Sequence, residues 1–168
     1  ALAAQRRMIL GELTLQSEPL AHPDPQALTA AMLAALRRLG MAVLPWTPAM
    51  RAWQARVQLL RRLAAGPEDW PDLSDAALTA DLETWLAPYL EGVTSLKALA
   101  RLDLSHALRG RLTWRQQQLL ETQAPTHMVV PSGSRRSIDY GSDPPVLAVR
   151  LQEMFGCVDT PTIAAGRL

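Results

Sequence analysis

The chain has 168 residues, 48% of them hydrophobic, and a formal net charge of +1. This length suits one domain of ordinary size with a buried core, and this hydrophobic fraction argues against intrinsic disorder. The near-zero charge excludes the global electrostatic field by which strongly basic proteins attract nucleic acid.

Residue types for covalent and metal chemistry are scarce. Cys157 is the single cysteine, which excludes an internal disulfide. No Cys/His cluster has the spacing of a zinc site, and no pair of carboxylates is placed for acid–base catalysis. No apolar run approaches the length of about 18 residues that a membrane-spanning helix needs, and no signal peptide is recognisable. We therefore expect no membrane partner and a cytoplasmic location.

Arginine supplies 16 of the 17 basic side chains, the exception being Lys97. A GC-rich genome explains this bias without any function. The alternative is phosphate recognition, because the planar guanidinium group binds phosphate oxygens in pairs. Composition does not choose between the two.

The N-terminal segment predicts β structure. Hydrophobic residues alternate around Ile9, Leu13 and Leu15, which predicts one strand over residues 7–16. A lone strand is unstable in water, so it must pair with the β segment near the C-terminus or with residues outside this chain. We interpret residues 1–22 as a strand and linker left from an upstream β-rich domain.

Residues 23–124 are predicted to form a helical domain. Asp24, followed by a proline, is typical of a helix start, and Gly40 of a helix end. Pro48 marks the start of a second helix, and Ser74 is the expected N-cap of a third.

The last helix of this domain is predicted from a capping box. Thr113 and Gln116 have the spacing at which a cap hydroxyl and a glutamine satisfy each other's backbone N–H groups. This last helix must end before Pro125. Earlier in the chain, Pro88 is expected to lie close to the end of the third helix.

Two residue types in the helical domain have both a structural and a functional interpretation. Arginines near helix C-termini complement the helix dipole, and they would form a basic groove only if two such ends converged. Tryptophans could stack bases, but core packing explains them better. The residues are Arg37, Arg38, Arg61, Arg62, Arg109 and Arg111, and Trp46, Trp53, Trp70, Trp85 and Trp114.

After residue 125 the hydrophobic period changes from 3.6 to 2. Residues 126–130 and 135–140 are predicted to form a hairpin. Residues 146–151 are expected to form a third strand that leads into a helix at 152–155, and residues 162–164 are expected to start a fourth strand. The fold class is therefore α+β and mostly α: a bundle of five or six helices with a small antiparallel β element near the C-terminus, residues 125–168 forming a truncated hairpin-containing segment.

The hairpin turn is the best candidate for ligand binding. Ser132, Gly133 and Ser134 offer hydroxyls and backbone N–H groups, and Arg135 and Arg136 follow directly. Successive strand residues point to opposite faces, so only one of the two arginines can act with the turn. We predict contact with a phosphate group or an RNA backbone here, and the candidate residues are Ser132, Ser134, Arg135 and Arg136. The alternative is a plain turn flanked by solvated charges, since Ser-Gly turns are common.

His127 lies just before the first of these strands. As a general base it would need a partner, for which Asp139 is the cross-strand candidate. A structural or surface role explains this histidine better, and the same holds for His22 and His106.

Eight short motifs occur in one order along the chain. Four lie in the helical part: Leu44-Pro-Trp-Thr47, Trp70-Pro-Asp-Leu-Ser-Asp75, Trp85-Leu-Ala-Pro-Tyr-Leu90 and Arg101-Leu-Asp-Leu104. Four lie in the tail: Pro131-Ser-Gly-Ser-Arg135, Ile138-Asp-Tyr140, Pro145-Val-Leu-Ala-Val-Arg-Leu-Gln-Glu153 and Thr160-Pro161. Together they resemble the C-terminal region of HrpB-type ATP-dependent RNA helicases, of the bacterial DEAH-box class.

The resemblance implies a part of a larger enzyme. Members of that family are long proteins in which two RecA-like motor domains precede helical and β-rich accessory domains. The chain begins with Ala1 and stops at Leu168 without an end signal, so we expect a fragment from near the C-terminus. The resemblance implies ATP and Mg²⁺ for the full-length protein, bound by motor domains outside this chain.

No phosphate-binding Gly-rich loop followed by a lysine occurs here. We therefore assign no catalytic, cofactor-binding or metal-binding residue and expect the segment itself to be inactive. Its expected role is to contact the RNA backbone or to brace the motor domains. The expected partners are its own upstream motor and accessory domains, with RNA as a further candidate. The alternative is a protein-interaction or structural module without nucleic-acid contact. A free-standing enzyme is disfavoured, because no nucleophile, base or metal set can be assembled.

Overall fold

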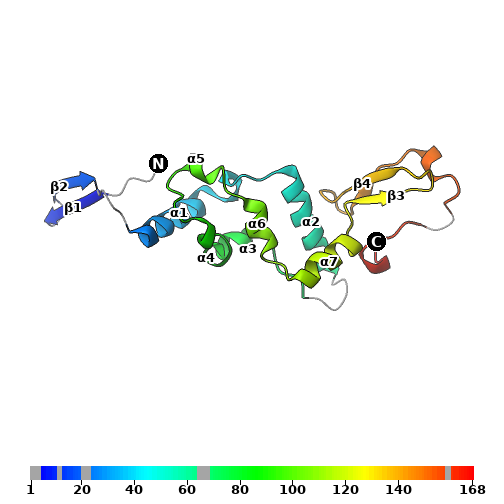
Figure 1. Ribbon diagram of the computed structural model, residues 1–168, viewed down its shortest axis with the longest axis horizontal. Coiled ribbons are helices and arrows are strands. Elements are labelled where there is room, and N and C mark those ends of the chain that lie inside the picture. Colours follow the sequence, from blue (N-terminus) through cyan, green and yellow to red (C-terminus); the bar gives the residue numbers. More distant parts are fainter. Residues whose placement is uncertain (1–4, 11–12, 20–23, 64–68, 158–159) are drawn as a thin grey trace. The chain divides into compact units, whose positions relative to one another are not determined.

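The computed structural model describes residues 5–10, 13–19, 24–63, 69–157 and 160–168 (Figure 1). These residues divide into two compact units. The first unit comprises residues 1–45 and 79–107, and the second unit comprises residues 46–78 and 108–168.

The fold is α+β and mostly α, as predicted. The helices are α1 (Pro25–Leu39), α2 (Pro48–Leu63), α3 (Asp75–Ala80), α4 (Leu82–Trp85), α5 (Leu96–Leu99), α6 (Leu104–Arg109) and α7 (Trp114–Gln123). Short 3₁₀ turns are η1 (Met41–Val43), η2 (Ala87–Tyr89), η3 (Leu151–Met154) and η4 (Ala164–Gly166). The strands are β1 (Gln5–Leu10), β2 (Leu13–Pro19), β3 (His127–Val129), β4 (Arg135–Asp139) and β5 (Val146–Leu147).

The N-terminal strand prediction needs correction. Residues 5–19 form two antiparallel strands, β1 and β2, which pair with each other from Gln5↔Pro19 to Leu10↔Leu13. The register shifts between Met8 and Ile9. A hairpin partner inside the same segment removes the need for the distant β element that a single strand would require. The predicted linker at residues 20–22 lies outside the described residues.

Helix α1 starts and ends where the sequence predicts. The Asp24 carboxylate accepts a hydrogen bond of 3.1 Å from the backbone N–H of Gln26. Gly40 adopts φ +78°, a conformation that favours glycine, and its N–H donates to the carbonyl of Leu36 at 2.8 Å. The face between these caps is buried through Met32, Leu33 and Leu36.

The predicted third helix is broken into pieces. Its start is confirmed, because the Ser74 hydroxyl accepts a hydrogen bond from the N–H of Ala77 at 3.2 Å. The helix ends at Ala80, and α4 resumes after the non-helical Asp81. Pro88 lies in η2, just beyond α4.

A buried cation links the two long helices of the second unit. Arg56 of α2 is 3% exposed. Its Nε donates to the carbonyl of Ala124 at 2.5 Å and its Nη2 to the carbonyl of Leu120 at 3.2 Å. Nη2 also lies 3.0 Å from the carboxylate of Glu121. Arg56 therefore satisfies carbonyl groups at the C-terminal end of α7, where no further helical turn follows.

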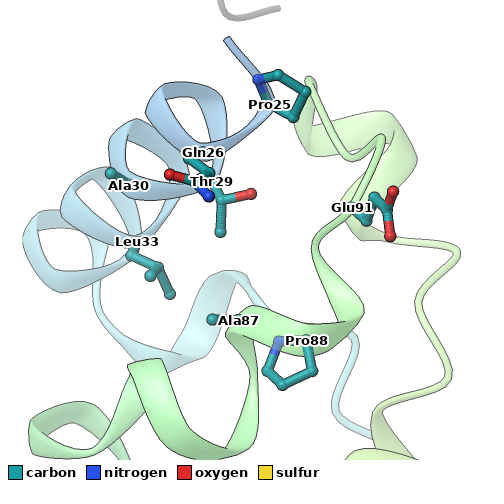
Figure 2. A pocket seen from close by; sticks show the side chains of 8 residues that line it. All are labelled: Pro25, Gln26, Thr29, Ala30, Leu33, Ala87, Pro88 and Glu91. Atoms are coloured by element: carbon teal, nitrogen blue, oxygen red, sulfur yellow. The ribbon is translucent and has the colours of Figure 1, made fainter.

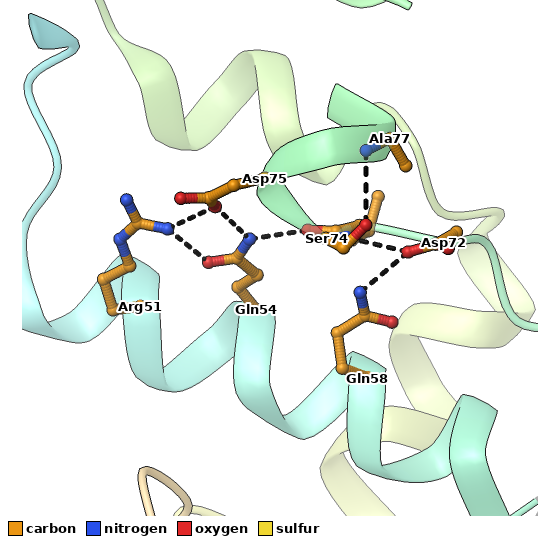
Figure 3. A network of polar contacts seen from close by, with 8 residues as sticks. Arg51, Gln54, Gln58, Asp72, Ser74, Asp75 and Ala77 are labelled. Carbon is orange, nitrogen blue, oxygen red and sulfur yellow. Dashed lines mark hydrogen bonds and ion pairs between the residues drawn. The ribbon is translucent and has the colours of Figure 1, made fainter. Parts of the chain in front are cut away.

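A polar network joins α2 to the segment that starts α3 (Figure 3). Gln54 is buried, and its amide nitrogen donates to the carbonyl of Leu73 at 2.5 Å and to the Asp75 carboxylate at 3.0 Å. Arg51 pairs with the same carboxylate at 2.6 Å, and its guanidinium lies 3.7 Å from the centre of the Trp46 ring. These contacts lower the pKa of Asp75, Arg51 being the main cause.

Asp72 forms a second branch of this network. The amide of Gln58 donates to its carboxylate at 2.9 Å, and the backbone N–H of Ser74 does so at 2.9 Å (Figure 3). These donors, with Gln58 contributing most, lower the pKa of Asp72 to about 2. The carboxylate is thus charged at any physiological pH.

The predicted C-terminal hairpin is confirmed. β3 and β4 pair antiparallel, and β5 pairs with the other edge of β4. Tyr140 closes this element onto α7, since its hydroxyl donates to the carbonyl of Pro125 at 2.6 Å. Burial raises the pKa of this hydroxyl to about 12.

The chain after β5 differs from the prediction in two places. The expected helix at 152–155 is the 3₁₀ turn η3, Leu151–Met154. The expected strand at 162–164 is wrong: the chain instead enters η4, in which Ala164 and Ala165 have positive φ values of 52° and 56°. Alternation over three residues is too short a pattern to specify a strand.

Arg56 offers a test of this packing. We expect Arg56→Ala to lower the free energy of unfolding of the chain by about 2–4 kcal/mol, because two carbonyls lose a buried partner and a cavity is left. Glu121→Gln is the control and should cost less than about 1 kcal/mol, because that carboxylate is 60% exposed. Urea denaturation followed by circular dichroism measures both values. Equal effects of the two substitutions would contradict the structural role of the carbonyl contacts.

Candidate functional site

The C-terminal sheet has one solvent-exposed face and one covered face. Along β3, β4 and β5 exposed residues alternate with half-buried ones. Val129 lies opposite Arg135, His127 opposite Ser137, and Asp139 opposite Val146. We call the exposed set the outer face; it consists of His127, Val129, Arg135, Ser137, Asp139 and Val146.

The turn between β3 and β4 uses its own backbone donors. The N–H of Ser132 donates to the carbonyl of Glu153 at 3.2 Å, and that of Gly133 to the carbonyl of Val130 at 2.8 Å. The N–H of Ser134 lies 3.4 Å from the hydroxyl oxygen of Ser132, whose own proton is directed to Ser134 Oγ at 3.2 Å. The expected anion-binding row of free N–H groups is therefore absent from this turn, and a ligand would meet mainly serine hydroxyls.

Arg136 points to the covered face and is engaged there. Its guanidinium forms an ion pair with Glu153, with Nε 3.1 Å from Oε2. The same carboxylate accepts from the backbone N–H of Arg150 at 3.0 Å and is only 13% exposed. Arg136 first, and Arg150 second, hold the pKa of Glu153 below its ordinary value. Arg136 thus connects β4 to η3.

Arg135 is the member of the predicted site that faces solvent. It stands on the outer face beside Val129, and within the described part of the chain no carboxylate pairs with it. The opposite orientation of the two neighbouring arginines is confirmed. The structure therefore brings Arg135 and the serine hydroxyls to one end of the hairpin and separates Arg136 from them.

Several of the arginines singled out in the sequence form ion pairs with carboxylates of their own unit. Arg37, which the sequence places at a helix end, pairs with Glu83 in the first unit. In the second unit Arg61 lies 3.5 Å from Asp72, and Arg62 lies 2.9 Å from Asp143. With Arg51, Arg56 and Arg136, at least six of the sixteen arginines form ion pairs with carboxylates. This pairing removes much of the positive charge that a phosphate-binding surface would need.

His127 is a surface residue, and no catalytic partner for it is found among the residues that the structure describes. Its Nδ1 contacts the Thr126 hydroxyl at 3.1 Å. The proposed partner, Asp139, instead accepts from the N–H of Gly141 at 2.8 Å and from the Ser142 hydroxyl at 3.1 Å. The surface interpretation of His127 fits this geometry.

The structure exposes apolar residues that the sequence analysis assigned to the core or passed over. Trp53, Trp70 and Trp85 are buried as predicted, but Trp114 is 74% exposed. The structure gives the reason: the buried residues of α7 are Gln116 and Leu120, four apart, and a residue two positions before Gln116 points away from that face. Leu151, the first residue of η3, and Phe155, which directly follows η3, are 78% and 69% exposed.

Neither a cluster of metal ligands nor a nucleotide-binding loop is found among the described residues. Among the described residues no three His, Cys, Asp or Glu side chains come together as a metal site. The sequence lacks a Gly-rich phosphate-binding loop, and in the hairpin turn the backbone N–H groups of Ser132 and Gly133 are already hydrogen-bonded. In the same described residues, no helix is both long and apolar enough to span a bilayer.

Comparison with known proteins identifies the family to which the chain belongs. Residues 85–168 match the family model HrpB_C, described as the ATP-dependent helicase C-terminal domain. The chain belongs to this family. It is also 49% identical over 169 residues to the ATP-dependent RNA helicase HrpB of Escherichia coli strain K12, a match that covers 99% of this chain and 21% of the relative.

Two crystal structures share the fold. One is the E. coli DExH-box NTPase HrpB, with a TM-score of 0.81, 45% identity and coverage of 98% of this chain and 20% of that one. The other is the Escherichia coli DEAH/RHA helicase HrpB, with a TM-score of 0.79, 45% identity and coverage of 98% and 21%. The chain thus spans about a fifth of the length of the relatives it matches, so the HrpB_C segment described here is part of a larger multidomain protein.

The Glu153 contacts predict a local response to pH. Because the pKa of Glu153 is lowered in the folded state, its contribution is present above the ordinary value of 4.5 and is lost as the pH falls through the folded pKa. We expect the hydrogen-exchange protection factor of the Ser132 N–H to stay constant above pH 4.5, the ordinary carboxyl pKa, and to fall as the pH drops below it. Glu153→Gln should remove most of this pH dependence. The Ala124 N–H, bonded inside α7, is the control, and an equal loss of protection there would indicate general unfolding instead.

Proposed function

We infer that this HrpB_C segment is a non-catalytic docking module that braces other domains of its own helicase. In this view ATP binding and hydrolysis belong to motor domains outside the chain, and the protein acts in the cytoplasm. The role supplied here is mechanical: a folded surface that holds its neighbours in place.

The composition of the outer face carries this proposal. Val129 and Val146 are 65% and 46% exposed, and the face has one cation, Arg135, and one anion, Asp139. A mixed face of exposed aliphatic groups and balanced charge is typical of protein–protein contacts. A phosphate-binding face would instead carry several cations.

Two further observations support docking over nucleic-acid binding. The ion pairs described above use six arginines inside the two units, so that these guanidinium groups are already matched with carboxylates. Trp114, Leu151 and Phe155 are large apolar side chains that remain exposed in the second unit. Exposed tryptophan is among the side chains that contribute most to protein interfaces.

Substitution of the outer face tests this function. We expect Val129→Asp combined with Val146→Asp to weaken binding of the separately expressed chain to the rest of its protein by about tenfold or more, since one tenfold change corresponds to ~1.4 kcal/mol. Isothermal titration calorimetry gives the affinity, and circular dichroism checks that the variant is folded.

Leu96→Asp is the matched control for that experiment. Leu96 is 53% exposed, similar to the two valines, but lies in the first unit. It should change the affinity by less than about twofold. An outer-face variant that binds as well as the Leu96 variant would refute docking through this face.

A second candidate function is contact with the RNA backbone at the hairpin turn. The specific observation in its favour is that Arg135 faces solvent without a carboxylate partner among the described residues, next to the hydroxyls of Ser132 and Ser134. One guanidinium and two hydroxyls suit a phosphate oxygen and read no base, so this contact would be weak and independent of sequence.

Salt titration separates this candidate from docking. If Arg135 contacts a phosphate, Arg135→Ala should lower the affinity for a single-stranded oligouridylate and reduce the magnitude of the salt slope by about 0.7. Fluorescence anisotropy at several salt concentrations measures both. Arg101→Ala, another exposed arginine, is the control. Salt slopes that are indistinguishable between the two variants would refute RNA contact at this turn.

A further inference from the structure

The first unit contains a groove that none of the functions above uses. It has a volume of about 440 Å³ and lies between the N-terminal half of α1 and the η2 turn (Figure 2). Its lining comprises Pro25, Gln26, Thr29, Ala30 and Leu33 from α1, and Ala87, Pro88 and Glu91 from the chain around η2.

Both walls of the groove are anchored in the core. Leu33, at the base of the α1 wall, is 5% exposed. The opposite wall is fixed by Leu86 and Leu90, which flank η2 and are buried to 0% and 1% exposure. A backbone hydrogen bond across η2, from the Leu90 N–H to the Ala87 carbonyl at 3.0 Å, stabilises this turn. The groove is therefore already formed before anything binds, and little ordering accompanies binding.

The small side chains of the walls favour an extended peptide. Pro25, Ala30, Ala87 and Pro88 present flat apolar surfaces with no long side chain to fill the space between them. An extended backbone also needs hydrogen-bond partners, and the groove supplies them. The Gln26 amide offers a donor and an acceptor, and the Thr29 hydroxyl offers a second pair. In the described part of the chain neither side-chain group has a partner.

The charge at the edge of the groove indicates which charge a bound segment should carry. Among the described residues that line the groove, Glu91 is the one with an ionisable side chain; it is exposed, and no cation in the same described part pairs with it. The Asp24 carboxylate stands next to Pro25, where it caps α1. No lysine or arginine is found among the described residues that line the groove. The Glu91 carboxylate at the edge of an apolar groove complements a lysine or arginine in the segment that binds.

We propose that this groove binds an extended segment of the protein's own longer polypeptide, with small apolar or proline residues in the groove and a basic residue paired with Glu91. The inference rests on the proposed docking function. The source is chosen because the matched relatives have about four fifths of their length outside the matched region, so such a segment is covalently attached and present at high local concentration.

Photo-crosslinking in the full-length protein tests this assignment. A benzophenone amino acid is placed at position 30, in the groove, or at position 31, which is equally exposed on α1 but does not line it. Mass spectrometry identifies the captured peptide. We expect at least about fivefold more capture from position 30, from a segment of the same polypeptide that includes a lysine or arginine.

Charge reversal at the rim makes the test specific. Glu91→Lys should reduce capture at position 30 by about two- to fivefold, the range expected for loss of an exposed ion pair, and Glu91→Gln should have a smaller effect. Capture that is equal at positions 30 and 31, unchanged in Glu91→Lys, directed to an acidic segment, or found only on another molecule would each overturn the proposal. If the outer-face variant still weakens docking while the groove captures nothing, the groove assignment fails and the docking function stands.

Discussion

The second unit depends on a guanidinium buried between two helices. Arg56 reaches from α2 to the last carbonyls of α7, at Leu120 and Ala124. The next residue, Pro125, has no N–H to continue the helix, and its carbonyl receives the Tyr140 hydroxyl. The start of the C-terminal sheet is therefore determined by three features together: the end of α7, Pro125 and the Tyr140 hydroxyl. A lysine in place of Arg56 could not reproduce this, because two carbonyls in different directions require the planar fork of donors.

Carboxylates placed on neighbouring elements shape the surface of the two units. The arginine-rich composition of the chain is compatible with phosphate binding, yet Arg37, Arg61 and Arg62 each meet an acidic side chain from a distant part of the sequence. Exposed pairs of this kind contribute little to stability individually. Their larger consequence is for recognition, because a guanidinium paired with a carboxylate attracts phosphate less strongly. What distinguishes Arg135 is therefore its orientation: it stands on the outer face while its neighbour Arg136 is committed to Glu153.

Local chemistry predicted much of the fold, and long-range contacts account for what it missed. Asp24, Gly40, Ser74 and the Thr113–Gln116 capping box determine helix ends through contacts within a few residues, and the structure has all of them. The exposure of Trp114 depends on which face of α7 is buried, and that follows from packing against α2. The loss of the turn's N–H groups depends on Glu153, about twenty residues away, which no local pattern reveals.

The outer face and the groove need not be strong sites to hold the segment in place. A partner on the same polypeptide binds at an effective concentration in the millimolar range when the connection is short and flexible, so an interaction too weak to detect between separate molecules can still be occupied. Surfaces with two valines, or with prolines, alanines and one carboxylate, suit this regime. Under the proposed docking function, they would bind while attached and be released when the connected domains move. A large, strongly apolar interface would instead lock those domains, which is unsuitable for a protein whose relatives are helicases and NTPases. The modest apolar exposure of the outer face and the groove therefore fits the proposed docking module, whose contacts would have to break and re-form as the connected domains move.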